Sequence, residues 1–196
     1  MSSQKISEKP FASQIVLRTV AQRCTHADVV VEGQSCGVLQ SGLLLLIGFG
    51  KNVETLTPDW LEEFASQSPA EALTQLQPVF QKWWDKISQL RIFSDSEGRI
   101  NESLLQQPES SGLYLVSQFT LFADLRKGNR PSFSAALEAA AARRCFELLL
   151  KFVTEKIAPR PIFSGVFAAD MKVSLVNDGP LTILFDCSLE RGIEAL

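Results

Sequence analysis

Residues 113–122 constrain the fold more than any other part of the chain, because they form a strand-like run that carries polar groups to both of its faces. Apolar and aromatic residues surround Ser117, Gln118 and Thr120, which is typical of one buried strand. Alternation directs Ser117 to one face and both Gln118 and Thr120 to the other. An unpaired buried hydroxyl or amide costs about 1–3 kcal/mol. These groups therefore either bond neighbouring backbone and fix the register, or they meet a ligand.

A second segment, Val-Asn-Asp-Gly-Pro-Leu-Thr at residues 176–182, lies between two strand-like runs. Turn chemistry alone predicts a hairpin there. The Gly179–Pro180 bond can also be cis at modest cost, and a fixed cis bond would present two carbonyls in an orientation that a trans bond cannot give. The segment is thus either an ordinary turn or a carbonyl-bearing surface.

The length and composition predict one globular domain. The chain has 196 residues, of which 45% are hydrophobic and 21% are charged. Its apolar runs are too short to span a membrane, so we expect no membrane partner. Residues 1–16 have no apolar signal core and read as a flexible leader, which leaves a domain over residues 17–190. We expect a cytoplasmic protein.

The cysteines and the single histidine exclude several kinds of site. Cys24, Cys36, Cys145 and Cys187 are scattered, and only His26 could join them as a metal ligand. We therefore expect buried thiols, no metal and no cofactor. With a single histidine, the chain can hardly form a Ser-His-Asp triad or use a histidine as a general base. Any hydrolysis must therefore use a catalytic mechanism without a histidine base.

The formal net charge of −3 argues against a general nucleic-acid coating protein, because nonspecific affinity comes mainly from neutralising phosphates. One basic cluster nevertheless follows Thr120, formed by Arg126, Lys127 and Arg130. Such a run is either a solvated loop or a small basic surface at the entrance of a site.

The order of elements predicts a mixed α/β domain, since strands precede, separate and follow the helices without regular βαβ alternation. Thr57 and Ser68 are candidate helix N-caps, the second with Glu71 placed for a capping box. Pro78 is expected to interrupt the helix that follows. Residues 134–158 are expected to form the longest helix.

Four motifs occur in order along the chain. Ser-Gln-Phe-Thr-Leu begins at Ser117, Arg-Lys-Gly-Asn-Arg-Pro-Ser-Phe at Arg126, Ala-Asp-Met-Lys-Val at Ala169, and Asn-Asp-Gly-Pro-Leu-Thr at Asn177. Together they resemble the signatures of the D-aminoacyl-tRNA deacylase (D-tyrosyl-tRNA(Tyr) deacylase) family over about residues 17–187. The resemblance implies a compact three-layer α/β/β domain with a mixed, largely antiparallel sheet. A helical insertion near residues 66–79 departs from the family pattern.

The resemblance also implies a function, the hydrolysis of D-aminoacyl-tRNA at its 3′ acceptor end as a proofreading step. Catalytic roles fall on Ser117, Gln118, Phe119 and Thr120, whose backbone N–H groups would face the ester carbonyl while the ribose 2′-OH assists water. An ester needs no protonated leaving amine, so positioning and oxyanion stabilisation suffice. Thr120 is expected to position rather than attack, because no base is evident to activate it.

Substrate selection is implied to lie in a homodimer whose active site is at the subunit interface. Gly179 and Pro180 would enter the partner's pocket, take the substrate ammonium with their carbonyls, and fill the space that an L side chain needs. A D side chain would point to solvent, and glycine would not be excluded. The other substrate-binding residues implied are Asn177, Thr182, Phe167, Met171 and Arg23, with Arg126, Lys127 and Arg130 as tRNA-binding residues.

One position departs from the family within the site region. Alanine stands at Ala168 where the family usually has glycine, and a positive φ there would be strained.

Three other functions stay open from the sequence. The chain could be a non-catalytic module that binds the tRNA acceptor end. It could be the paralogous deacylase that edits an L-amino acid, thought to use a trans Gly-Pro, although the intact Ser-Gln-Phe-Thr argues against this. A serine esterase for small substrates would lack its histidine and its Gly-x-Ser-x-Gly elbow.

Overall fold

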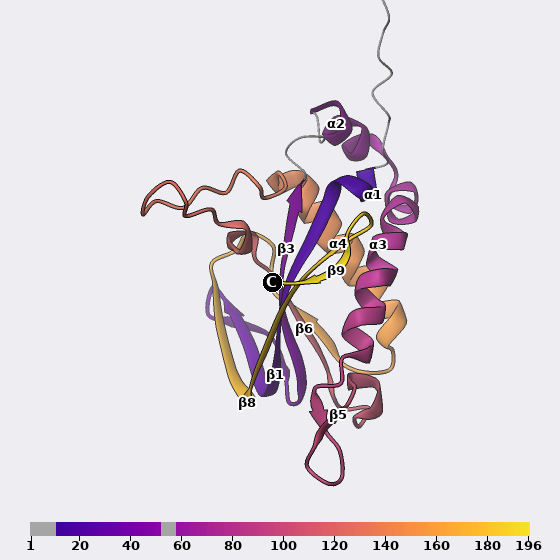
Figure 1. The fold of residues 1–196 in the computed structure, drawn as a ribbon, viewed down its shortest axis with the longest axis vertical. Coiled ribbons are helices and arrows are strands. Elements are labelled where there is room, and N and C mark those ends of the chain that lie inside the picture. The colour runs from indigo at the N-terminus through magenta and orange to yellow at the C-terminus, as the bar shows by residue number, and fades with distance from the viewer. Residues whose placement is uncertain (1–10, 52–57) are drawn as a thin grey trace, which may run out of the picture.

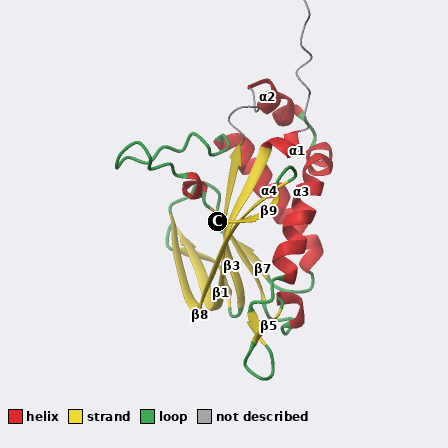
Figure 2. Cartoon of the chain, in the orientation of Figure 1, coloured by secondary structure: helices red, strands yellow, loops and turns green. Residues whose placement is uncertain are grey.

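The computed structural model describes residues 11–51 and 58–196, in which helices cover one face of a curved sheet (Figure 1, Figure 2). Within this part of the chain the sheet has seven strands, in the order β7-β6-β3-β1-β8-β9 with β2 paired to β1. The β3–β6 and β6–β7 pairs are parallel and the other pairs of this sheet are antiparallel. These strands are β1 (Ile15–Val31), β2 (Gln34–Leu39), β3 (Gly42–Lys51), β6 (Gly112–Ser117), β7 (Ile162–Ser164), β8 (Met171–Ser188) and β9 (Gly192–Ala195).

The remaining elements are helices and one short hairpin. They are α1 (Phe11–Gln14), α2 (Pro58–Ser66), α3 (Pro69–Gln89), α4 (Ala139–Ile157), the β4–β5 pair (Phe93–Ser94 and Ile100–Glu102), and 3-10 turns at Leu104–Gln106 and Phe119–Phe122. The predicted mixed α/β domain with a largely antiparallel sheet is confirmed.

Two hydrophobic cores divide the domain into layers. The larger core lies between α3, α4 and the sheet, and includes Trp83, Phe152 and Leu45. The smaller core, which includes Tyr114 and Val29, lies where the far halves of β1 and β8 curl over with β2. The sheet thus forms two layers beneath one layer of helices, which matches the three-layer expectation.

The helices differ from the sequence prediction in their extents. The capping box at the start of α3 is confirmed, because the Ser68 N–H donates to Glu71 Oε2 at 2.8 Å and the Glu71 N–H donates to Ser68 Oγ at 3.3 Å. The expected interruption at Pro78 is wrong, since α3 continues through it while burying its apolar side. The predicted cap at Thr57 lies outside the described residues.

The helix expected over residues 134–158 begins only at Ala139, and α3 is longer than it. The segment before it pairs with the end of β3 instead. The Lys51 N–H donates to the Ala135 carbonyl at 3.0 Å, and the Leu137 N–H donates to the Phe49 carbonyl at 2.9 Å. These backbone bonds compete with a helical start.

The expected leader is too long. Phe11 is fully buried and stacks on Phe64 with ring centroids 4.1 Å apart, and β1 begins at Ile15. Residues 11–16 therefore belong to the folded domain. No helix in the described ranges is both long and apolar enough to cross a membrane.

The Asn-Asp-Gly-Pro segment is a bulge in one long strand and not a hairpin turn. Both halves of β8 pair with β1, with Gln22 opposite Thr182 and Cys24 opposite Asn177. Four residues of β8 therefore face a single residue of β1, Arg23. The only cis peptide bond among the described residues joins Ala158 and Pro159, so the Gly179–Pro180 bond is trans. The predicted turn fails because its flanks share the same neighbouring strand.

Candidate functional site

A cavity of about 690 Å³ lies at the carboxyl end of β6, and we call it the substrate pocket. Its walls include five of the residues singled out from the sequence: Ser117, Gln118, Phe119, Phe167 and Met171. Two segments about 50 residues apart in the chain therefore meet around one space. The first three residues come from the end of β6 and the turn after it, and the other two from the loop between β7 and β8 and the start of β8.

The strand expected over residues 113–122 ends at Ser117. The Gln118 N–H donates to the Ile47 carbonyl at 2.8 Å, and Phe119–Phe122 then form a 3-10 turn. This turn packs against β3 at two glycines. A Cβ at Gly48 would lie 2.8 Å from the Gln118 carbonyl oxygen, and one at Gly50 would lie 2.2 Å from the Phe122 ring. The glycines of β3 thus let the turn approach the sheet.

Polar groups of the turn bond one another rather than lying buried in a strand. The Thr120 hydroxyl donates to Gln118 Oε1 at 2.6 Å, and Thr120 is exposed. Phe119 is 56% exposed and meets the edge of Phe133 at a centroid distance of 4.9 Å. The N–H groups of Phe119 and Thr120 have no hydrogen-bond acceptor among the described residues. Two backbone donors are therefore available where the turn begins beside the pocket.

The opposite wall is apolar and contains a strained residue. Phe167 packs against Phe146 with centroids 6.2 Å apart, and the Arg143 guanidinium lies 4.9 Å from the Phe167 ring. Ala168 follows at φ +63°, so the positive φ considered from the sequence is present. An alanine in this region costs about 1–2 kcal/mol relative to ordinary backbone. The loop keeps this geometry at the pocket wall.

The other predicted substrate-binding residues do not line the pocket of their own chain: Arg23 lies on β1, and Asn177, Gly179, Pro180 and Thr182 lie on the β8 bulge. Arg23 is buried beneath the bulge. Its Nε atom lies 2.9 Å from Asp178 Oδ2, and its Nη1 donates to the Ile92 carbonyl at 2.6 Å. Gly179 has φ +116°, and a Cβ there would lie 3.0 Å from Arg23 Nη2. The arginine thus supports the bulge from behind.

The ends of the bulge are tied together by side chains. Asn177 Nδ2 donates to Thr182 Oγ1 at 3.1 Å, and Asn177 Oδ1 accepts from the Leu181 N–H at 3.1 Å. Gly179 and Pro180 are exposed at its tip. The bulge is therefore a fixed, outward-facing surface.

The basic cluster lies on a loop that projects from the body between the 3-10 turn and α4 (Figure 1). Arg126 pairs with Asp124 through its Nε and Nη2 atoms at 2.9 and 2.7 Å. This pairing lowers the pKa of Asp124 and raises the pKa of Arg126. Lys127 and Arg130 are exposed on the same loop.

Sequence reasoning missed several pocket residues. Phe133 ends one of the quoted motifs, and its aromatic ring was the signal that could have marked it. Lys51 and Glu138 form an ion pair at the pocket, and Asp170 also lines it. The charges of Lys51 and Glu138 carried no local pattern, because Lys51 ends β3 and Glu138 precedes α4, whereas Asp170 lies in the Ala-Asp-Met-Lys-Val motif.

His26, the one histidine of the sequence, is paired with Val176 in the sheet and does not line the pocket. The four cysteines are free thiols. Besides the Lys51–Glu138 ion pair and Asp170, the site therefore offers backbone donors, an amide, hydroxyls and apolar walls.

Comparisons with known proteins found related sequences and folds. Residues 74–186 match the family model described as D-Tyr-tRNA(Tyr) deacylase. A D-aminoacyl-tRNA deacylase of Solidesulfovibrio magneticus is 41% identical, over 87% of this chain and 95% of that protein. Another, of Saccharophagus degradans, is 40% identical over 86% of this chain and 98% of that protein.

Two solved structures share the fold. One, described as a c-Myc DNA unwinding element binding protein, has a TM-score of 0.67 at 28% identity and covers 85% of this chain and 96% of its own. The other, described as a probable eukaryotic D-amino acid tRNA deacylase, has a TM-score of 0.64 at 17% identity. The match covers 87% of this chain and 99% of that chain. The family match and the curated relatives carry the assignment: the chain belongs to the D-aminoacyl-tRNA deacylase family, hydrolases that act on aminoacyl-tRNA.

Proposed function

We propose that the substrate pocket hydrolyses the ester between a D-amino acid and the terminal ribose of tRNA, as a cytoplasmic proofreading step in translation. The observation that carries the proposal is the pair of unpaired N–H groups on Phe119 and Thr120, at the start of the turn that lines an aromatic pocket. Phe119, Phe133 and Phe167 give this pocket flat apolar surfaces suited to the adenine ring or an amino-acid side chain.

The chemical step follows from these donors. An ester carbonyl oxygen placed at the turn would accept from the Phe119 and Thr120 N–H groups, which stabilise the negative charge that develops when water attacks. One such donor is worth about 10²–10³-fold in kcat. The electron pair of the broken bond goes to the ribose oxygen, which takes a proton from water. The neighbouring 2′-OH of the substrate orients the attacking water.

Thr120 acts in this scheme as a positioning residue. Its hydroxyl proton goes to Gln118 Oε1 at 2.6 Å, and an amide oxygen is too weak a base to activate a nucleophile. The bond fixes the Gln118 side chain, and with it the start of the turn that carries both N–H groups.

Chirality is proposed to depend on the bulge of a second copy of the chain. Gly179 and Pro180 are exposed and do not line the pocket of their own chain, so we expect them to act on the substrate of a neighbouring chain. Their carbonyls would take the substrate ammonium, and the rigid backbone would leave no space for an L side chain. Glycyl esters have no side chain to reject and would also be hydrolysed.

A homodimer is supported by an exposed apolar surface on β8. Val176 and Leu184 are 57% and 37% exposed, and Gly179 and Pro180 lie between them along the same strand. A two-fold dimer uses the same patch on both copies, which would bring each bulge toward the other chain.

The exposed loop is proposed to contact the tRNA acceptor end. The loop carries three basic residues: Arg126, Lys127 and Arg130. Asp124 forms an ion pair with the first of them. Contacts of this kind neutralise phosphates and weaken as salt rises.

The proposed function is tested by following ester loss from matched D-Tyr-tRNA and L-Tyr-tRNA. We expect rapid loss from the D ester only, and Pro180→Ala should let L-Tyr-tRNA react while the protein stays folded. Equal rates on both esters, or binding of aminoacyl-tRNA with no release of amino acid, would reject the proposal.

A second candidate is the editing of an L-aminoacyl-tRNA, and one observation favours it. The Gly179–Pro180 bond is trans, the state associated with the paralogous deacylase. The same experiment separates the two functions, because that activity would remove the L-amino acid and spare the D ester.

A further inference from the structure

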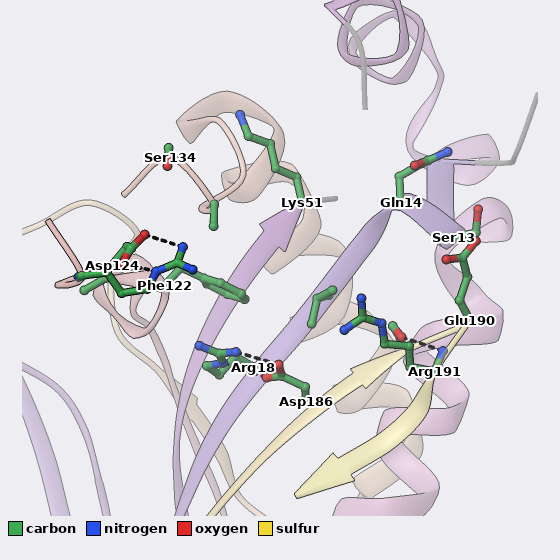
Figure 3. Close-up of a pocket in the computed structure, with 15 residues that line it drawn as sticks. Ser13, Gln14, Arg18, Lys51, Phe122, Asp124, Ser134, Asp186, Glu190 and Arg191 are labelled. Atoms are coloured by element: carbon green, nitrogen blue, oxygen red, sulfur yellow. Dashed lines mark hydrogen bonds and ion pairs between the residues drawn. The ribbon is translucent and has the colours of Figure 1, made fainter. Parts of the chain in front are cut away.

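A second cavity, of about 600 Å³, adjoins the substrate pocket, and we call it the basic cavity (Figure 3). Lys51 and Ser134 line both spaces. The basic cavity lies over the outer face of β1 and β8, and Lys51 stands at its boundary with the pocket. A chain leaving the pocket past Lys51 would enter this cavity directly.

The floor of the basic cavity is a fixed ion pair. Arg18 Nε and Nη2 donate to the two carboxylate oxygens of Asp186 at 2.8 and 2.7 Å, and Nη1 donates to the Leu121 carbonyl at 3.1 Å. The guanidinium also lies 4.7 Å from the Phe122 ring. These contacts neutralise Asp186, and they raise the pKa of Arg18 through its bond to that carboxylate.

Three other cations around the cavity retain unused donors. The Arg191 side chain is 73% exposed, and its Nη1 lies 4.0 Å from Glu194 Oε2; Glu190 also lines the cavity. Arg126 uses Nε and Nη2 for Asp124 and has no hydrogen bond from Nη1 among the described residues. Lys51 is paired with Glu138 and has further N–H groups to donate. Guanidinium and ammonium donors in such an arrangement suit phosphate oxygens.

We infer that the basic cavity binds phosphate groups of the tRNA acceptor strand, those that precede the terminal nucleoside, with Lys51 as the substrate-positioning residue at the junction. This inference rests on the proposed function of the adjoining pocket. Beyond the cavity, Arg126 leads onto the exposed loop with Lys127 and Arg130. A single strand that leaves the pocket through this cavity would therefore pass Lys51, Arg126 and Arg191.

The test uses two substrates that differ in whether phosphates are present: D-Tyr-tRNA, and 3′-O-D-tyrosyl-adenosine, which carries the same ester without a phosphate. Lys51→Ala and Arg191→Ala should each lower kcat/KM on D-Tyr-tRNA about 3–10-fold, through KM. The slope of log KM against log salt should fall by about 0.7 for each lost contact with a single strand. Arg191→Ala, which does not line the substrate pocket, should hydrolyse the adenosine ester at the wild-type rate. Lys51→Ala should lose more activity on D-Tyr-tRNA than on the adenosine ester.

Lys86→Ala is the matched control. Lys86 lines a separate cavity on α3, and its loss should change neither substrate. Unaltered KM on D-Tyr-tRNA in Lys51→Ala and Arg191→Ala, or an equal loss on both substrates, would overturn the inference while wild-type hydrolysis stands. Wild-type protein that cleaves neither ester would reject the proposed function as well. Arg191 is exposed enough that its truncation tests the cavity without unfolding the domain.

Discussion

Ala168 is a strained residue in the wall of the substrate pocket, because its φ of +63° lies in a region that favours glycine. Ala168→Gly should raise the free energy of unfolding by up to about 1 kcal/mol, as the relieved strain exceeds the greater freedom of glycine in the unfolded chain. Urea denaturation measures the change. The substitution should also alter KM, since a wall methyl is lost.

Glu32→Gly provides the comparison. Glu32 has φ +50°, is exposed, and lies in the turn after β1; it does not itself line the pocket, although its neighbour Val31 pairs with Met171. The Glu32→Gly substitution should raise the free energy of unfolding by a similar amount and leave KM unchanged. A destabilised Ala168→Gly protein would contradict the view that the wall is strained.

The thiols differ in burial, and this sets their reactivity. Burial raises the pKa of Cys24 to about 11 and that of Cys187 to about 12, and it raises the pKa of Cys145 further. An acid with a raised pKa stays protonated as pH rises, so these thiols should remain unreactive at pH 8. Native protein should therefore react rapidly with a disulfide reagent at Cys36 alone, and denatured protein at all four cysteines. Two or more rapid thiols in the native protein would contradict this.

The 3-10 turn is the element on which hydrolysis is proposed to depend, and Gly50 holds it against β3. A Cβ at Gly50 would meet the Phe122 ring at 2.2 Å. Gly50→Ala should push Phe122 and the turn outward, and lower kcat about 10–100-fold by displacing the N–H donors. Single-turnover hydrolysis of D-Tyr-tRNA measures this.

Gly98→Ala is the control for a glycine replacement in itself. Gly98 has φ +78° in the β4–β5 hairpin, with no atom within 4 Å of a new Cβ. It should cost stability, about 1 kcal/mol, and leave kcat unchanged. If Gly50→Ala kept wild-type kcat, the turn would not position the reacting ester.

Elements whose signals are local could be predicted from the sequence, and those decided by tertiary pairing could not. The Ser68–Glu71 capping box needs only four residues and was found in place. Pro78 was misjudged because apolar packing of α3 offsets the bond that a proline loses. Strand β6 ends at Ser117 because the chain turns over two glycines of β3, which are far away in sequence.

The site was predictable as motifs but not as one surface. Ser117, Gln118 and Phe119 meet Phe167 and Met171, whereas Gly179 and Pro180 lie elsewhere on the same chain. No sequence pattern near Asn177 reveals that its strand continues through a bulge, because that depends on pairing with β1. Lys51 and Arg191 carry no motif, and only the folded chain places both around one cavity.

At the scale of the whole molecule, the exposed β8 surface should join two copies. Val176→Arg places a charge in that surface and should yield a folded monomer with weak hydrolysis of D-Tyr-tRNA. Sedimentation gives the mass and circular dichroism the fold. Ile100→Arg is the control, because Ile100 is equally exposed, at 57%, in the β4–β5 hairpin. A dimeric, fully active Val176→Arg protein would contradict this interface.

The central claim is that one chain supplies the pocket and a second chain supplies the bulge that rejects L-amino acids. It is tested most directly by mixing Pro180→Ala chains with about a tenfold excess of Gly50→Ala chains and measuring hydrolysis of L-Tyr-tRNA. About nine in ten of the intact pockets then face a wild-type bulge. The account predicts that L-Tyr-tRNA hydrolysis falls to about a tenth while D-Tyr-tRNA hydrolysis by the same chains persists. Unchanged L-Tyr-tRNA hydrolysis after subunit exchange would show that each chain selects its substrate alone.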